Sequence, residues 1–305
     1  MPPEHFGEVV KAISFFINSG VRFVEEMCKM RAFVQLWDEL TLQRYGVADP
    51  SQHRFRYGVQ VNSLGLREAQ PENNVQRIVL EMLAVTLSRN ARARVLQLPA
   101  WNEVLGLPRP WDQQRSLRMQ QVLAFESDLL ECDDLFAGST VVEAMVAELL
   151  VGVRLEIDKV QEMGGAVAAV ESGYMKSAMV ASQSLRRQRI EAGADVVAGV
   201  NRFVTTAPNP RAVDFDAAIM AVDHDVEAKA AAAVVAWRRD RDSTEAGRSA
   251  AEVALARLLR DARSGVNLIP ASLDGAVLVS PLESGPRRCG MSSVSIAPPL
   301  GFPVP

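Results

Sequence analysis

Residues 55–111 decide the fold, and they read FRYGVQVNSLGLREAQPENNVQRIVLEMLAVTLSRNARARVLQLPAWNEVLGLPRPW. The largely apolar runs Phe55–Val61 and Arg94–Leu98 predict two strands, and Pro71 suits the first turn of a helix between them. This order of strand, polar loop, helix and strand is typical of the α/β class, in which helices cover a parallel sheet. Because such folds bind ligands at the loops that follow the strands, the two polar loops are the first candidates for a functional site.

A third strand is predicted before this stretch, at Ala12–Asn18, where AISFFIN forms a short apolar run. From Gly20 the apolar residues predict a largely buried helix that ends near Tyr45–Gly46. Later elements are predicted as helices at 112–131, 140–163, 165–171 and 174–193, and as a short extended piece at Val196–Phe203.

Three strands are too few for a closed barrel. An eight-stranded barrel uses about 250 residues and eight strand–helix units. Three parallel strands also leave two unpaired edges, which folded proteins usually pair or cover. We therefore expect that a partner chain or a further segment completes the sheet.

The composition excludes several classes of function. The chain has 305 residues, a net charge of −4 and no basic block, which argues against a nucleic-acid surface. No run approaches the ~20 apolar residues of a membrane helix, and the amino terminus has no signal-peptide pattern. The cysteines Cys28, Cys132 and Cys289 form no CxxC pair. These features predict a cytoplasmic protein without a zinc site or a disulfide framework.

The composition also divides the chain into three regions. It shifts near Ala207–Pro210, and the alanine-rich, charged stretch Asp214–Ala262 predicts two helices that are split near Asp242–Gly247. From Ser284 the chain holds glycine, proline and serine with little periodicity. The predicted regions are therefore an α/β region at 1–210, a helical, linker-like region at 211–283 and a disordered tail at 284–305.

Six segments resemble a known family. They are EHFGEVVKAISFFINSGVRFVEEMCKMRAFVQLWDEL, YGVQVNSLGLREAQPENNV, LQLPAWNEVLGLPRPWDQQ, FESDLLE, EMGGAVAAVESGYMKS and VVAGVNRF, within residues 4–210. Their sequences resemble those of the adenosylcobalamin-dependent acyl-CoA mutases, which form the methylmalonyl-CoA mutase family. Within that family, they resemble the ethylmalonyl-CoA mutase branch most. Members of that family fold as a (β/α)8 TIM barrel followed by a cobalamin-binding domain. The resemblance implies that AISFFIN, FRYGVQV and RVLQL are the last three strands of a partial TIM barrel, followed by a helical region.

The resemblance implies an adenosylcobalamin cofactor and assigns four positions to it. Gln60 matches a contact to the adenosyl and corrin region, where a side-chain amide can both donate and accept. Ser63 matches a position of close backbone approach that is often glycine in relatives. Glu103 matches a carboxylate that hydrogen-bonds the cofactor, and its two oxygens suit a ribose diol. Gly106 matches a corrin contact, where the missing side chain permits close approach.

The resemblance also assigns Ser14 to the acyl-CoA substrate, as a hydroxyl contact to the CoA portion. Relatives carry an arginine two residues earlier, but this chain has Ala12. Lys11 is adjacent, yet in a strand its side chain would point to the opposite face. The positive charge for the CoA phosphates is therefore missing from this strand.

Each of these residues also has a purely structural interpretation. Gln60 could be a loop amide that backbone groups satisfy, and Glu103 a first-turn carboxylate favoured by a helix dipole. The family's cobalt-ligating D-x-H-x-x-G motif is absent, because Pro3, Ser51 and Val222 stand two residues before the three histidines. The family's catalytic histidine, tyrosine and arginine belong to earlier strands. We therefore assign no catalytic residue and no metal ligand.

Three functions remain open from the sequence. The first is an incomplete mutase catalytic chain of isomerase type, which acts on an ethylmalonyl-CoA-like or methylmalonyl-CoA-like substrate once a partner chain supplies the other strands and the cobalamin domain. The second is a non-catalytic remnant, or a structural or regulatory partner of a mutase. The third is an interaction module that uses the alanine-rich helices after Asp214. We predict the first.

Overall fold

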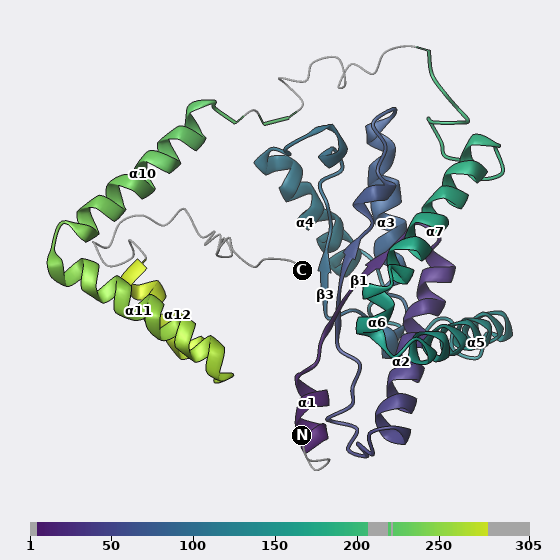
Figure 1. Ribbon diagram of the computed structural model, residues 1–305. Coiled ribbons are helices and arrows are strands. Elements are labelled where there is room, and N and C mark those ends of the chain that lie inside the picture. Colours follow the sequence, from purple (N-terminus) through teal and green to yellow (C-terminus); the bar gives the residue numbers. More distant parts are fainter. Residues whose placement is uncertain (1–4, 207–218, 221, 280–305) are drawn as a thin grey trace. The chain divides into compact units, whose positions relative to one another are not determined.

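The computed structural model describes residues 5–206, 219–220 and 222–279 (Figure 1). The chain divides into two units, Met1–Ala221 and Val222–Pro305. The predicted boundary at residue 210 and the predicted tail at 284–305 lie outside the described residues.

The described residues of the first unit form three strands, β1 (Phe15–Ser19), β2 (Tyr57–Val61) and β3 (Val95–Gln97). Its helices are α1 (Phe6–Ala12), α2 (Phe23–Gln43), α3 (Asn74–Ala84), α4 (Pro110–Phe125), α5 (Thr140–Glu162), α6 (Ala166–Glu171) and α7 (Tyr174–Glu191). Single 3-10 turns lie at η2 (Ser63–Gly65), η3 (Pro71–Asn73), η4 (Arg89–Ala91) and η5 (Glu103–Leu105).

The three strands form one parallel sheet in the order β1-β2-β3. This confirms the predicted α/β class and all three predicted strands, although each strand is shorter than predicted. The first strand begins later because Lys11 and Ala12 still belong to α1, so the expectation that Lys11 sits in a strand is wrong. An apolar run does not reveal where a helix ends and a buried strand starts, since both elements hide apolar side chains.

One face of the sheet is covered by α2, α3 and α4. Along β2, Tyr57, Val59 and Val61 alternate with less buried residues and are at most 2% exposed. They belong to one apolar cluster with Met30 of α2 and Ile78 of α3. Burying each large apolar side chain contributes about 1.5–3 kcal/mol, so this cluster fixes the crossover helices on the sheet.

The opposite face of the sheet remains open in the part of the chain that the structure describes. Phe16 of β1 and Val95 of β3 point away from the core and are each 62% exposed. Gly58 lies between them on β2, in register with both. Apolar side chains at this level of exposure on the two outer strands of the sheet indicate a surface that another element covers.

The helix α5 packs across α2 (Figure 1). Met27 and Cys28 of α2 form a second apolar cluster with Val142 and Val146 of α5. The helix predicted at 112–131 ends earlier, at Phe125, and the loop that follows leads to α5.

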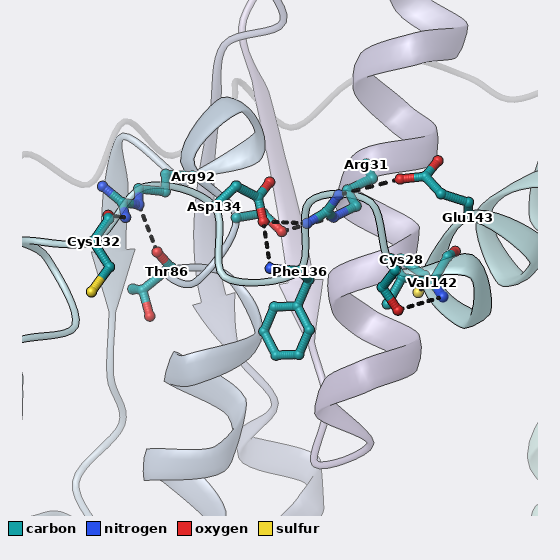
Figure 2. Close-up of polar contacts among 11 residues, drawn as sticks. Cys28, Arg31, Thr86, Arg92, Cys132, Asp134, Phe136, Val142 and Glu143 are labelled. Atoms are coloured by element: carbon teal, nitrogen blue, oxygen red, sulfur yellow. Dashed lines mark hydrogen bonds and ion pairs between the residues drawn. The ribbon is translucent and has the colours of Figure 1, made fainter.

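Polar contacts hold this loop against α2 and the end of α3 (Figure 2). The Arg31 guanidinium lies 2.5 Å from Asp134 and 3.8 Å from Glu143, and it also donates to the Ser88 hydroxyl at 2.9 Å. Arg92 reaches the same loop through the backbone carbonyl of Cys132. Figure 2 shows Arg31 between the two carboxylates, so one cation joins the loop and α5 to α2.

The prediction of an extended piece at Val196–Phe203 is wrong. The segment is a turn closed by an isolated bridge between Ala198 and Arg202. The Asn201 side chain donates to the carbonyls of Ile190 and Asp195 and accepts from the Val197 amide. These local hydrogen bonds replace the ladder that an extended strand would need.

Within residues 222–279, the second unit contains α10 (Asp225–Asp242), α11 (Glu245–Ser264) and α12 (Ile269–Val279). The predicted split between two helices is confirmed, because Thr244 caps α11 by accepting from the Gly247 amide at 3.1 Å. The helices α11 and α12 pack together. Across the described ranges, no helix combines the length and the apolar character needed to cross a membrane.

Candidate functional site

A row of side-chain amides crosses the open face near the carboxyl end of the sheet. Gln60 of β2 is in register with Asn18 of β1 and Gln97 of β3. The Asn18 side-chain amide donates to the backbone carbonyl of Gln60 at 3.1 Å. Side-chain amides both donate and accept, so the row can bind a ligand rich in amides or hydroxyls. Asn18 and Gln97 were not predicted as site residues from the sequence, although each stands near the end of a predicted strand.

Ser63 lies at the same end of the sheet as Gln60. It opens η2 directly after β2 and is half-buried. The Asn62 amide donates to the Ser19 carbonyl at 2.9 Å, and the Leu66 amide donates to the Ser63 carbonyl at 3.1 Å. These bonds fix the loop at the carboxyl ends of both β1 and β2.

Glu103 is presented by the loop after β3, so it also lies at the carboxyl edge of the sheet. It is exposed at the start of η5, next to Trp101 and Asn102, which are buried. Both buried neighbours donate to the Asp112 carboxylate, at 2.9 Å from the indole and 3.0 Å from the amide. The Asn74 amide of α3 donates to the Trp101 carbonyl at 2.9 Å. The loop is therefore a rigid support for an exposed carboxylate.

Gly106 follows η5 with φ +145°, a conformation that disfavours any other residue. A Cβ atom at this position would lie 2.8 Å from the Ile219 Cδ1 atom. The Met220 amide donates to the Leu107 carbonyl at 2.8 Å, so the chain itself passes beside the glycine. Packing of Ile219 explains the glycine, and its predicted contact with a corrin ring stays a prediction.

Ser14 lies at the other, amino end of the sheet. It precedes β1 and is exposed, and Phe15 is in register with Tyr57, so Ser14 is level with Arg56. Gln60 lies four positions along the chain from Arg56, which corresponds to roughly 13 Å along the strand. The structure therefore does not bring Ser14 together with the other predicted site residues.

Two arginines stand with Ser14 at this end. Ser14, Phe16, Arg56, Gly58, Arg94 and Val95 are among the residues that line a shallow hollow of about 410 Å³. Arg56 donates to the carbonyls of Lys11 and Ser51, at 2.8 and 3.0 Å. These two arginines were not singled out from the sequence. Their position was a usable signal, since each immediately precedes the first residue of a strand.

Residues 5–279 match the protein family described as methylmalonyl-CoA mutase. The chain belongs to the methylmalonyl-CoA mutase family. It is 56% identical over 276 residues to an ethylmalonyl-CoA mutase of Cereibacter sphaeroides, covering 90% of this chain and 41% of the relative. An ethylmalonyl-CoA mutase of Methylorubrum extorquens is 55% identical over 271 residues, covering 89% of this chain and 38% of the relative. A methylmalonyl-CoA mutase of Cereibacter sphaeroides is 29% identical over 264 residues, with coverages of 87% and 35%.

These mutases confirm the predicted family and its ethylmalonyl-CoA mutase branch, since identity to that branch is nearly twice the identity to the methylmalonyl-CoA mutase. The family match continues past residue 210, to residue 279, so it includes the helices α10, α11 and α12. The chain spans about two fifths of the length of the ethylmalonyl-CoA mutases that it matches.

Proposed function

We propose that this chain forms part of the catalytic barrel of an adenosylcobalamin-dependent acyl-CoA mutase. The reaction is an isomerisation of the carbon skeleton of an ethylmalonyl-CoA-like or methylmalonyl-CoA-like substrate. The observation that carries the proposal is the sheet itself, which is covered on one face and open on the other, with Gln60 and Glu103 at its carboxyl end. In barrel enzymes this end of the strands holds the active site.

The remaining strands of the barrel come, in this proposal, from a longer polypeptide or from a partner chain. Among the described strands only β2 is paired on both sides, so β1 and β3 each offer a free edge. Closure of a parallel sheet removes such edges and turns one of its faces into the barrel interior. Phe16 and Val95, which are exposed on the open face, would then become buried.

The residues at the carboxyl edge suit the polar groups of the proposed cofactor. Gln60 would bind corrin or ribose groups through its amide, Ser63 would pack under the cofactor, and Glu103 would accept hydrogen bonds from ribose hydroxyls. When bound, adenosylcobalamin supplies the 5′-deoxyadenosyl radical. The contribution of this chain is to orient the cofactor and to help exclude water from the closed barrel.

The residues at the amino end of the sheet suit the CoA portion of the acyl-CoA substrate. Ser14 would bind the CoA portion through its hydroxyl group. Arg56 and Arg94 line the same hollow and supply the positive charge that Ala12 does not. Guanidinium groups bind phosphate groups well, so we propose that these arginines contact the CoA phosphates.

The test is a turnover assay with the chain co-expressed with the product of a neighbouring gene. Ethylmalonyl-CoA and methylmalonyl-CoA are offered together with adenosylcobalamin, and the isomerised acyl-CoA is quantified. Glu103→Gln is expected to lower turnover at least tenfold, while the exposed Glu126→Gln is the matched control and keeps it. If no complex forms and no substrate is converted, the partner-chain form of the proposal is wrong.

A further inference from the structure

A buried carboxyl group lies directly behind the loop that carries Ser63. Glu81 of α3 is 1% exposed, and its Oε2 atom has no hydrogen-bond partner among the residues that the structure describes. Burial and, to a smaller extent, the negative charge of Glu26 raise the pKa of this carboxyl to about 8. The Asn62 amide and the Arg77 charge act in the opposite direction but are weaker. Glu81 is therefore a neutral acid at pH 7.

Hydrogen bonds gather three elements around this carboxyl. The Ser19 hydroxyl at the end of β1 donates to the backbone carbonyl of Glu81 at 3.1 Å. The Ser19 carbonyl in turn accepts from the Asn62 amide at 2.9 Å. A Cβ atom on Gly65 would lie 3.3 Å from Glu81 Oε1 and 3.8 Å from the Asn62 side-chain nitrogen. The loop after β2 therefore lies directly over the Glu81 side chain.

The nearby cations are engaged elsewhere. Lys29 of α2 forms an ion pair with Glu26 and donates to the Asn18 carbonyl at 2.9 Å. Arg77 of α3 donates to the Asn74 side chain at 2.6 Å and to the Ala198 carbonyl at 2.9 Å. An ionised Glu81 would thus be a buried charge with Glu26 as a like-charged neighbour, which is costly.

We infer that Glu81 is a positioning residue that holds the loop Asn62–Leu66, and with it Ser63, against the carboxyl ends of β1 and β2. The neutral acid fills the space under Gly65 without a counter-ion. Ionisation requires water or a cation, and opening of the loop that lies over Glu81 would admit either. The link between this loop and a cofactor rests on the proposed function, but the placement of the loop does not.

The test is amide hydrogen exchange of the full chain without cofactor, corrected for the intrinsic effect of pH. From pH 7 to pH 9, the opening of residues 62–66 is expected to increase about tenfold in the wild-type chain, because each pH unit between the ordinary glutamate pKa and about 8 is worth a factor of ten and the effect ends above about pH 8. Glu81→Gln has nearly the same shape and cannot ionise, so its loop should stay closed at both values. Glu68→Gln, an exposed carboxyl outside this loop, is the control and should behave as the wild type.

The inference would be overturned if the wild-type loop opened equally at pH 7 and pH 9. It would also be overturned if the increase in opening between these pH values persisted in Glu81→Gln. If Glu81→Gln does not fold, Gly65→Ala gives a second test, because its methyl group crowds Glu81 Oε1 from the loop side. It should open the loop at pH 7 while α5 stays protected, and a loop that is unchanged in Gly65→Ala contradicts the inference. All these measurements omit the cofactor, so a failed turnover assay leaves their outcome intact.

Discussion

At the scale of single residues, Glu81 makes the stability of the chain depend on pH. The ordinary pKa of glutamate is about 4.3, and burial raises the pKa of Glu81 to about 8. As pH rises between these values, the unfolded chain releases a proton that the folded chain keeps. The free energy of unfolding therefore falls with rising pH, by up to about 1.4 kcal/mol per pH unit, and the effect ends above about pH 8.

Urea unfolding at pH 5, 7 and 9 checks this dependence. Relative to the wild type, Glu81→Gln should become progressively more stable as pH rises, because glutamine removes the ionisation and leaves the other titrating groups in place. Parallel stability profiles for the two chains would show that Glu81 does not titrate as described.

A second prediction at this scale concerns Arg31. The side chains of Arg31 and Asp134 are only 13% and 15% exposed, so Arg31→Ala leaves a poorly hydrated carboxylate without its main partner. We expect a loss of about 2–3 kcal/mol in the free energy of unfolding. The matched control is Arg187→Ala, since Arg187 and Glu191 are 80% and 59% exposed, and it should leave the free energy of unfolding nearly unchanged. Similar losses for both variants would contradict the assignment of Arg31 as the cation that holds the loop.

At the scale of elements, the support under Glu103 depends on Asp112. This residue is 5% exposed and accepts from the Trp101 indole and the Asn102 amide. Asp112→Ala removes the acceptor of two buried donors, at a cost of about 1–3 kcal/mol for each. Urea unfolding should show this loss, and exchange of residues 101–106 should increase. Unchanged exchange in this segment would contradict the rigid support.

The elements also show what the sequence could predict. The three strands and the crossover helices follow from apolar runs and helical periodicity. The row of Asn18, Gln60 and Gln97 could not be predicted, because the register of parallel strands depends on packing between elements. Glu81 could have been found, since Asn74, Ile78, Glu81 and Met82 share one buried stripe of α3. Ile219 beside Gly106 is a contact across more than a hundred residues, which no local pattern indicates.

At the scale of the whole molecule, the two units should unfold independently of one another. The first unit has two apolar clusters of its own, and the second has buried alanines at the contact of α11 with α12. A chain shortened to residues 1–221 should keep its cooperative thermal transition and the amide protection of β1, β2 and β3. Loss of that protection would show that the sheet needs the second unit.

In the proposed function, this chain is a working part of a mutase barrel. A chimera in which residues 5–279 of this chain replace the matched segment of the Cereibacter sphaeroides ethylmalonyl-CoA mutase tests this proposal. We predict that the chimera converts ethylmalonyl-CoA in the presence of adenosylcobalamin, and that Glu103→Gln in the chimera lowers this turnover at least tenfold. A folded chimera that binds adenosylcobalamin and shows no turnover would contradict the account.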